Sequence, residues 1–390
     1  MTTSWTAVWV LFLAGLTAGA QLTKVPPALP AMRAELGLTL IESGLVQTML
    51  YIVGAAVAVF IGVLADRFGQ KRAALAGLCL MTLGGVLGAL APGYAALLFS
   101  RALEGIGFVL VIVGATPLVA AVALPSDRPT AFALWSAYMP AGGTLALLLA
   151  PLALEHLGWR SLWIALAALT AACAVLLLRL VPPAPFGGRT RPLRLLAESL
   201  GRPGALALCA VFICYVGQWN AVMTWLPTFA VEERGASAGT AALLTAGFVA
   251  INIPGTFLGG LLLRLGASRA SVLAGGAAAM ACAAAGLLAA GAPDGLRFAS
   301  ALAFSLLGGV IPAAVFAGTA VHAKSPDHFG TMNGMIMQSS HLSQFVVPIL
   351  VAWTATHAGG WSASLGTMLA LAGAGIVGAL AVGRYEPEPR

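Results

Sequence analysis

Charged residues are scarce in this chain. Asp, Glu, Lys and Arg together make up 8% of its 390 residues, whereas hydrophobic residues make up 60%. About a quarter of the residues of an ordinary soluble protein are charged, and a soluble chain of this length could not cover its surface with so few. The composition therefore excludes two or three soluble domains and indicates a protein whose main solvent is lipid.

Cysteine is also sparse, and its spacing excludes a disulfide framework or a metal site. The five cysteines all lie in apolar runs without metal-ligand spacing, so we interpret them as small core residues. The sequence lacks a Walker segment or other phosphate-cradling loop, which argues against ATP as an energy source. We expect no cofactor and no bound metal. The net charge of +7 comes from basic residues scattered over short loops, which argues against nucleic acid as a partner.

Apolar runs, in contrast, are abundant and long enough to cross a bilayer. A spanning helix needs about 20 apolar residues, and the first run lacks the positive region of a cleaved signal peptide, so we expect it to remain as a span. Cutting the sequence at Pro, Gly and charge clusters predicts twelve spans, at about 5–28, 44–64, 73–91, 97–124, 131–154, 160–181, 205–230, 241–263, 270–291, 297–320, 330–353 and 362–383.

One longer connection divides these spans into two sets of six. We therefore predict an N-terminal six-helix bundle over 1–181, a cytoplasmic linker over 182–204 and a C-terminal six-helix bundle over 205–390. With a cytoplasmic N-terminus, most of the 20 basic residues lie on the inner side, as the positive-inside rule requires. The exceptions are Lys24, Arg33, Arg101, Arg160, Arg234 and Arg297. We expect a multi-pass protein of a bacterial inner membrane with both termini in the cytoplasm.

The two halves contain a repeated segment. Residues 62–72, GVLADRFGQKR, align with residues 259–269, GGLLLRLGASR, and each segment ends the second span of its half. The repeat predicts a duplicated six-helix unit, which is a property of secondary transporters whose substrate site lies between the halves near mid-membrane.

The first copy of the repeat closely resembles the loop signature of the major facilitator superfamily, G-x-L-x-D-R-x-G-R/Q-K/R-R. Residues 101–107, RALEGIG, are similar to the fourth-helix element R-x-x-Q/E-G-x-G of the same family. The resemblance implies an all-α membrane protein in which twelve transmembrane helices form two pseudo-symmetric six-helix bundles that work by alternating access.

The resemblance also implies a set of gating residues around the loop after the second span. In the family this cluster latches the cytoplasmic side closed, with Asp66 and Arg67 as its charged members. Glycines allow close helix approach and a sharp turn there, and a carboxylate can bond helix N-terminal amides and pair with a nearby arginine. The second copy has Leu263 at the Asp66 position, so a latch there is weaker or absent. The alternative interpretation of the first copy is that its charged residues only anchor a loop. The predicted gating set is Gly62, Asp66, Arg67, Gly69 and Arg72.

Three ionisable residues inside the spans are candidates for function, because placing a charged group within a bilayer costs free energy. Arg101 and Glu104 are three residues apart and share a helix face, and Lys24 lies near the outer part of the first span. We predict that Lys24 and Arg101 bind substrate, that Glu104 takes part in proton coupling, and that their net positive charge favours a small anion. The alternatives are a neutralised Arg101–Glu104 pair that stabilises a bend, and a Lys24 that reaches the membrane interface.

Neutral polar and aromatic side chains in other spans complete the predicted binding site, with helix–helix packing as the alternative for each. An imidazole can also titrate near neutrality, so His341 is a second candidate for proton coupling. The further substrate-binding candidates are Trp135, Tyr138, Gln218, Asn220, Asn252, Gln338 and His341.

We expect a secondary active transporter, not an enzyme, that moves a small organic or inorganic anion across the inner membrane by proton-coupled symport. The alternative is a drug/proton antiporter, since residues 138–143 partly match a fifth-helix antiporter signature. Residues 134–137 resemble the cyanate branch of the family, although the first span lacks the Asn-Arg-Pro of that branch. A polytopic membrane enzyme has no nucleophile–base pair to support it. The expected partners are the substrate, protons and the bilayer, and we expect a monomer.

Overall fold

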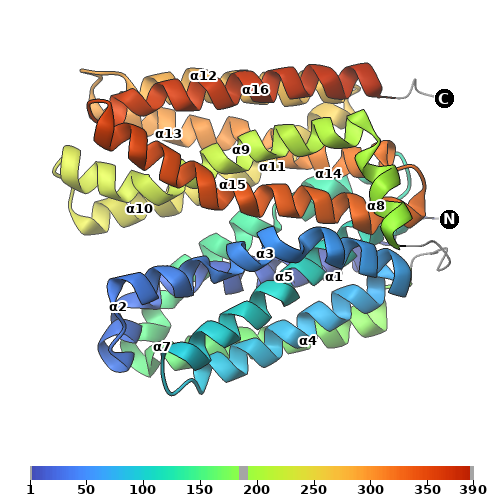
Figure 1. The fold of residues 1–390 in the computed structure, drawn as a ribbon, viewed down its shortest axis with the longest axis horizontal. Coiled ribbons are helices and arrows are strands. Elements are labelled where there is room, and N and C mark those ends of the chain that lie inside the picture. The colour runs from blue at the N-terminus through green and yellow to red at the C-terminus, as the bar shows by residue number, and fades with distance from the viewer. Residues whose placement is uncertain (1, 184–191, 387–390) are drawn as a thin grey trace. The chain divides into compact units, whose positions relative to one another are not determined.

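The computed structural model describes residues 2–183 and 192–386, and these residues form helices and loops without a β-strand (Figure 1). The helices are α1 (Trp5–Thr23), α2 (Val25–Leu36), α3 (Leu40–Phe68), α4 (Gln70–Ala89), α5 (Tyr94–Val122), α6 (Arg128–Ser136), α7 (Tyr138–Leu180), α8 (Pro192–Leu200), α9 (Pro203–Thr228), α10 (Ala238–Ala250), α11 (Asn252–Arg264), α12 (Arg269–Leu288), α13 (Asp294–Gly308), α14 (Val310–His322), α15 (Phe329–His357) and α16 (Ser364–Tyr385). Short helical turns lie at η1 (Phe229–Glu233), η2 (Pro326–His328) and η3 (Trp361–Ala363).

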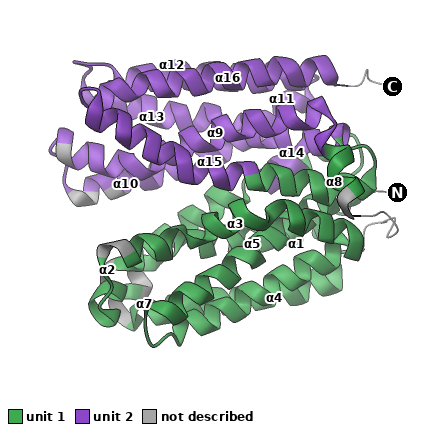
Figure 2. Ribbon diagram, in the orientation of Figure 1, with its two compact units in different colours: residues 1–131, 137–199, 323–338 green, residues 132–136, 200–322, 339–390 purple. Residues whose placement is uncertain are grey.

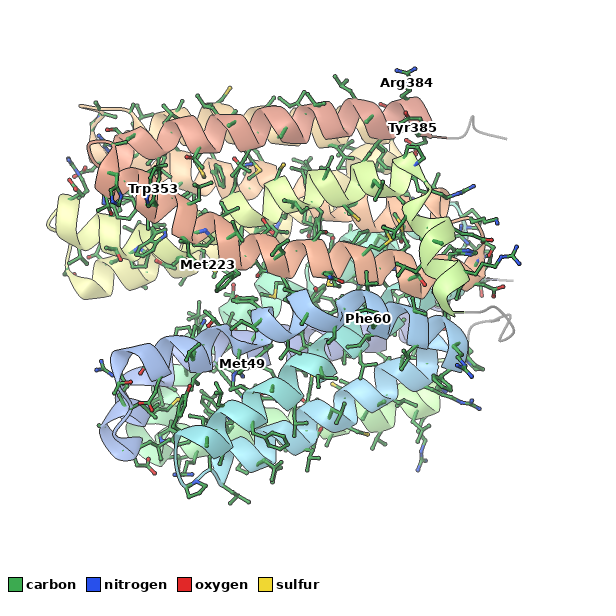
Figure 3. All side chains as sticks on the ribbon, in the orientation of Figure 1. Met49, Phe60, Met223, Trp353, Arg384 and Tyr385 are labelled. Atoms are coloured by element: carbon green, nitrogen blue, oxygen red, sulfur yellow. The ribbon has the colours of Figure 1, made fainter. Side chains whose placement is uncertain are left out.

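Within these residues, 12 stretches of helix are long and apolar enough to cross a membrane, and each overlaps one predicted span. The all-α fold class with twelve transmembrane helices is therefore confirmed. The ends differ by a few residues: the second span covers Glu42–Phe68, whereas 44–64 was expected. Many apolar side chains point away from the protein, including Phe60 on α3 at 58% exposure and Trp353 on α15 at 57% (Figure 3), as expected for helix faces in contact with lipid.

Local signals explain where several helices begin and end. Thr39 starts α3 with a capping box, because its hydroxyl accepts a hydrogen bond from the Glu42 N–H at 3.2 Å and the Glu42 carboxylate accepts one from the Thr39 N–H at 2.8 Å. Gly69, at φ 97°, forms the turn between α3 and α4. Gly158, at φ 75°, interrupts α7, which therefore contains parts of two spans.

The two copies of the repeat share a backbone feature as well as a sequence pattern. Gly266, which occupies the position of Gly69 in the second copy, also has a positive φ, of 91°. Gly69 directly follows the span Glu42–Phe68, and Gly266 lies two residues after the end of the span Leu243–Arg264. Because L side chains rarely adopt this conformation, glycine is required at both turns, which is what a duplicated unit predicts.

The described chain forms two compact units (Figure 2). Unit 1 comprises Met1–Ala131, Ala137–Ser199 and Ala323–Gln338, and unit 2 comprises Phe132–Ser136, Leu200–His322 and Ser339–Arg390. In unit 1, α1 packs on α7, and α5 packs on both α3 and α4; in unit 2, α16 packs on α9 and α12. The predicted bundle boundaries at 181 and 205 stay a prediction. Arg189 and Arg191 of the predicted linker lie outside the described residues.

Candidate functional site

A cluster of three ionisable side chains lies buried in unit 1. The ammonium group of Lys24 donates a hydrogen bond to Glu104 Oε1 at 2.6 Å. The guanidinium group of Arg101 donates to the other oxygen of the same carboxylate, Oε2. All three side chains are 0% exposed. The structure therefore brings together the three residues that the sequence singled out.

The break between α1 and α2 positions Lys24. Pro26 and Pro27 lie two and three residues after it, in the first turn of α2, and a proline lacks the N–H that would continue the hydrogen bonding of α1. Lys24 also donates to the side-chain oxygen of Gln21, whose amide nitrogen donates to Thr170 Oγ1 on α7 at 3.3 Å. Lys24 is fully buried, so its side chain lies inside the protein and not on a surface that faces lipid.

Arg101 and Glu104 are held by close packing of α5. Arg101 Nη1 donates to the Gln21 carbonyl oxygen at 3.1 Å and its Nε to the Val46 carbonyl oxygen at 3.3 Å. On α4, a Cβ atom added at Gly84 would lie 2.8 Å from Cγ of Glu104. Glycine at this position therefore lets α4 approach the carboxylate closely.

Two donors beside the cluster have no hydrogen-bond partner among the described residues: Nη2 of Arg101 and the indole Nε1 of Trp163. The Lys24 ammonium nitrogen lies 4.3 Å from the centroid of the Trp163 ring, which is a cation–π geometry. Two cations and one carboxylate leave one net positive charge in this buried site. An anion at this site would compensate the charge and accept from the free donors.

A second polar contact in unit 1 joins α3 to the first turn of α15. The Asp66 carboxylate accepts hydrogen bonds from the backbone N–H groups of Gly330 and Thr331 and from the Thr331 hydroxyl, each at 2.6 Å. Gln70 also donates to it at 3.3 Å. Asp66 thus caps the N-terminus of another helix, where the free amides and the helix dipole favour a negative charge.

The close approach that this contact requires depends on glycine. A Cβ atom added at Gly330 would lie 2.6 Å from Oδ1 of Asp66, and one added at Gly62 would lie 3.1 Å from Cα of Gly334. Arg67 and Arg72, the basic members of the predicted gating set, are exposed. The guanidinium carbon of Arg67 lies 5.5 Å from the centroid of the Phe68 ring. Among the described residues no ion pair joins either arginine to Asp66, so the carboxylate is held by a helix terminus.

A cluster around Glu198 holds the segment that precedes α15, and the sequence did not predict it. Glu198 on α8 accepts from Lys324 Nζ at 2.8 Å, from His328 at 3.0 Å and from Arg194 at 2.7 Å. The hydrogen bonds from Lys324 first, and then from Arg194 and His328, lower the pKa of Glu198 to about 2. Only the i,i+4 spacing of Arg194 and Glu198 could have signalled part of this cluster.

The hydrogen bonds given for the polar residues of unit 2 that were predicted to bind substrate are formed within that unit. Asn252, at the break between α10 and α11, donates to the Ser305 carbonyl oxygen at 2.7 Å and to the Tyr215 hydroxyl at 3.2 Å. Asn220 donates to the Gln344 carbonyl oxygen at 3.1 Å. These contacts agree with the packing interpretation. Gln218 donates to a carbonyl oxygen of its own helix, and its Oε1 atom is buried without a partner among the described residues.

The remaining candidates are distributed over both units. Gln338 accepts from the Val59 N–H at 3.2 Å and belongs to unit 1, as does the buried Tyr138. Trp135 and His341 are buried and belong to unit 2. The described residues contain no group of three or more His, Cys, Asp or Glu side chains that could hold a metal ion.

Comparisons with known proteins place this architecture in a family. The family model described as Major Facilitator Superfamily matches residues 11–348. The chain is 29% identical over 218 residues to a puromycin resistance protein of Streptomyces alboniger, and 29% identical over 234 residues to the cyanate transport protein of Escherichia coli. These matches cover 55% and 59% of this chain, and 43% and 59% of the relatives, so the chain spans about half the length of the curated relatives it matches.

The fold agrees with the same assignment. The crystal structure of the fucose:proton symporter of E. coli superposes with a TM-score of 0.81 at 17% identity, over 97% of this chain and 98% of the symporter. At this identity the likeness concerns the fold. Together with the family model and the 12 apolar helices, it shows that the chain belongs to the Major Facilitator Superfamily.

Proposed function

We propose that this transporter moves a small organic or inorganic anion together with a proton across the bacterial inner membrane. The observation that carries the proposal is the buried cluster of Lys24, Arg101 and Glu104, in which two cations share one carboxylate. Uncompensated charge is costly inside a membrane and marks a substrate or ion pathway. The similarity to a cyanate transport protein supports an anionic substrate.

The geometry supports a coupling mechanism based on competition. Each Glu104 oxygen is bonded to one cation, so an anion that binds Lys24 and Arg101 displaces Glu104. A buried carboxylate that has lost its cationic partners takes up a proton, because the neutral form avoids the cost of an unpaired charge. Anion and proton then bind together, and by linkage each strengthens the binding of the other.

Alternating access requires contacts that form and break during the cycle. We assign this role to the bonds between Asp66 and the first turn of α15, with Gly62 and Gly69 shaping the close approach and the turn. Arg67 and Arg72 remain gating candidates by resemblance. Of the other predicted substrate contacts, Gln218 keeps the strongest support, because its buried Oε1 atom has no partner among the described residues.

The test is transport by purified protein in liposomes that contain a pH-sensitive dye. We expect added cyanate or small carboxylates to drive proton entry, and Arg101→Gln or Lys24→Gln to abolish it. Arg33→Gln is the matched control, because Arg33 is an exposed cation on the neighbouring helix α2. Normal transport by both cluster variants would contradict the anion site.

The alternative proposal is a drug/proton antiporter, which the similarity to a puromycin resistance protein favours. The same liposomes distinguish the two functions. Proton exit driven by lipophilic cations, without any response to anions, would replace symport by antiport.

A further inference from the structure

A cavity of about 250 Å³ lies in unit 2. It is formed at one end of the unit, where η1 follows α9, α12 ends, α13 begins, and a loop joins α15 to α16. Charged and hydroxyl side chains that line it are Glu233, Arg234, Arg297 and Ser362. The proposed transport function uses none of these residues.

Arg297 is the buried cation of this cavity. Arg297 is only 7% exposed. Its guanidinium group donates hydrogen bonds to the carbonyl oxygens of Ala292 at 2.9 Å and Leu287 at 3.0 Å. Among the described residues no ion pair involves Arg297, whereas the neighbouring Arg234 is bonded to Asp294 at 2.5 Å. A buried guanidinium without a carboxylate partner favours an anionic group in the cavity.

An apolar cavity of about 40 Å³ adjoins the polar one, because Phe229, Leu288 and Trp361 line both. The ring centroids of Trp225 and Trp361 are 5.7 Å apart, and Trp225 is fixed by a hydrogen bond from its Nε1 to the Pro348 carbonyl oxygen at 2.9 Å. The combined space therefore has a charged part and a narrow aromatic part, which suits a molecule with a polar head and an alkyl chain.

The position of the two cavities at the ends of candidate spans indicates the kind of amphiphile. They lie where spans end: Pro203–Val231 and Arg269–Leu288 finish there, and Asp294–His322 and Trp361–Tyr385 begin there. Trp353, 57% exposed near the end of α15 (Figure 3), is of the type found at membrane interfaces. Phospholipid headgroups occupy this level of the bilayer, and their acyl chains run toward its centre.

We propose that this end of unit 2 binds one phosphatidylethanolamine molecule. Arg297 holds the phosphate, the first part of an acyl chain lies against Phe229 and Trp361, and the exposed carboxylate of Glu233 faces the ammonium group. The opposite charges of Arg297 and Glu233 match the zwitterionic headgroup, while Arg234 is already neutralised by Asp294.

Native mass spectrometry of the purified protein, titrated with dioleoyl phosphatidylethanolamine or dioleoyl phosphatidylglycerol, tests the proposal. We expect the wild type to retain one phosphatidylethanolamine molecule in preference to phosphatidylglycerol. Arg297→Gln should weaken retention about tenfold or more, the loss expected for a charge-assisted hydrogen bond. Arg234→Gln is the matched control in the same cavity and should change it little, and Glu233→Gln should remove the preference between the two lipids.

A second variant keeps the proposal testable if Arg297→Gln fails to fold. Ala290 lines the polar cavity and is exposed, so Ala290→Trp fills the space while Arg297 is retained, and it should also lose the lipid. Unchanged retention by this variant would overturn the site. Displacement of the lipid by millimolar inorganic phosphate would mean a free-anion site, and equal binding of both lipids by the wild type would refute the ethanolamine assignment.

Discussion

Glu104 is bonded through both oxygens to cations in a site closed to solvent. Glu104→Gln keeps the size of the side chain but leaves two buried cations without a counter-ion, and removing one partner of a buried pair costs about 3–5 kcal/mol. We expect lower thermal stability and loss of proton-driven uptake, while exchange of substrate between the two sides of the membrane continues. Thermal unfolding and paired uptake and exchange assays in liposomes measure these effects.

A suitable control for that variant is Glu35→Gln. Glu35 is also bonded to a cation, Arg160, but its side chain is 48% exposed, and solvent-exposed ion pairs contribute little to stability. The hydrogen bonds from Arg160 and Trp159 lower the pKa of Glu35, so it remains ionised near neutral pH. Proton-driven uptake by Glu104→Gln at the wild-type rate would exclude Glu104 from coupling.

The sequence predicted part of the buried cluster of Lys24, Arg101 and Glu104. Spacing alone places Arg101 and Glu104 on one helix face, and the rarity of charge in a span marks all three residues. The bond from Lys24 to Glu104 joins residues 80 positions apart. It depends on the break after α1 and on the small residue at Gly84, which are properties of packing that no local pattern reports.

At the scale of helices, the cap that Asp66 places on α15 is a contact whose strength can be measured. Asp66→Asn keeps an acceptor oxygen but loses the charge that the helix N-terminus favours, so we expect a loss of about 1–2 kcal/mol. In a double-mutant cycle with Thr331→Val, the two effects should be less than additive, because each weakens or removes the hydrogen bond between the Thr331 hydroxyl and the side chain at position 66. Thermal unfolding gives the energies, and initial transport rates show whether the contact limits the cycle. Strict additivity, with unchanged transport, would contradict the latch.

We expect the docking of α8 to depend on pH through Glu198. Since folding lowers the pKa of this carboxyl to about 2 from an unfolded value of about 4.3, its contribution to stability is complete above about pH 5 and is lost as the pH falls toward 2. We expect the difference in Tm between the wild type and Glu198→Gln to shrink over that range. Lys324→Gln should reduce the same difference at neutral pH. A Tm difference that is constant from pH 6 to pH 3 would refute this role.

Helix positions were predictable from apolar runs, but several helix ends were not. The span that begins at Glu42 was expected from residue 44, because the run of apolar residues starts late while the Thr39–Glu42 capping box starts the helix earlier. Gly69 and Gly158 mark turns at positive φ. Glycine can adopt this conformation, but a glycine in the sequence does not by itself predict a turn. Hydropathy locates the lipid-facing middle of a helix, whereas caps and turns decide its ends.

At the scale of the whole molecule, chain order and packing do not coincide everywhere. Residues Ala323–Gln338 follow the predicted linker in sequence but cluster with unit 1. The bonds that they form to Asp66 and Glu198 explain the assignment. The sequence marks Asp66 through the loop signature but contains no sign of its partner, because the partner is the backbone of a helix end.

The distribution of basic residues predicts an orientation of the molecule in the membrane, which can be tested by labelling. With a cytoplasmic N-terminus, the exposed Ser126, after the span Tyr94–Val122, lies inside, and the exposed Ser362, at the start of the span Trp361–Tyr385, lies outside. A membrane-impermeant maleimide applied to intact cells should therefore label Ser362→Cys and spare Ser126→Cys until the membrane is opened. The native Cys79 and Cys282 are exposed only on helix faces within spans, which a membrane-impermeant reagent does not reach. Labelling of Ser126→Cys in intact cells would reverse the orientation, and with it the side from which the anion and the proton enter.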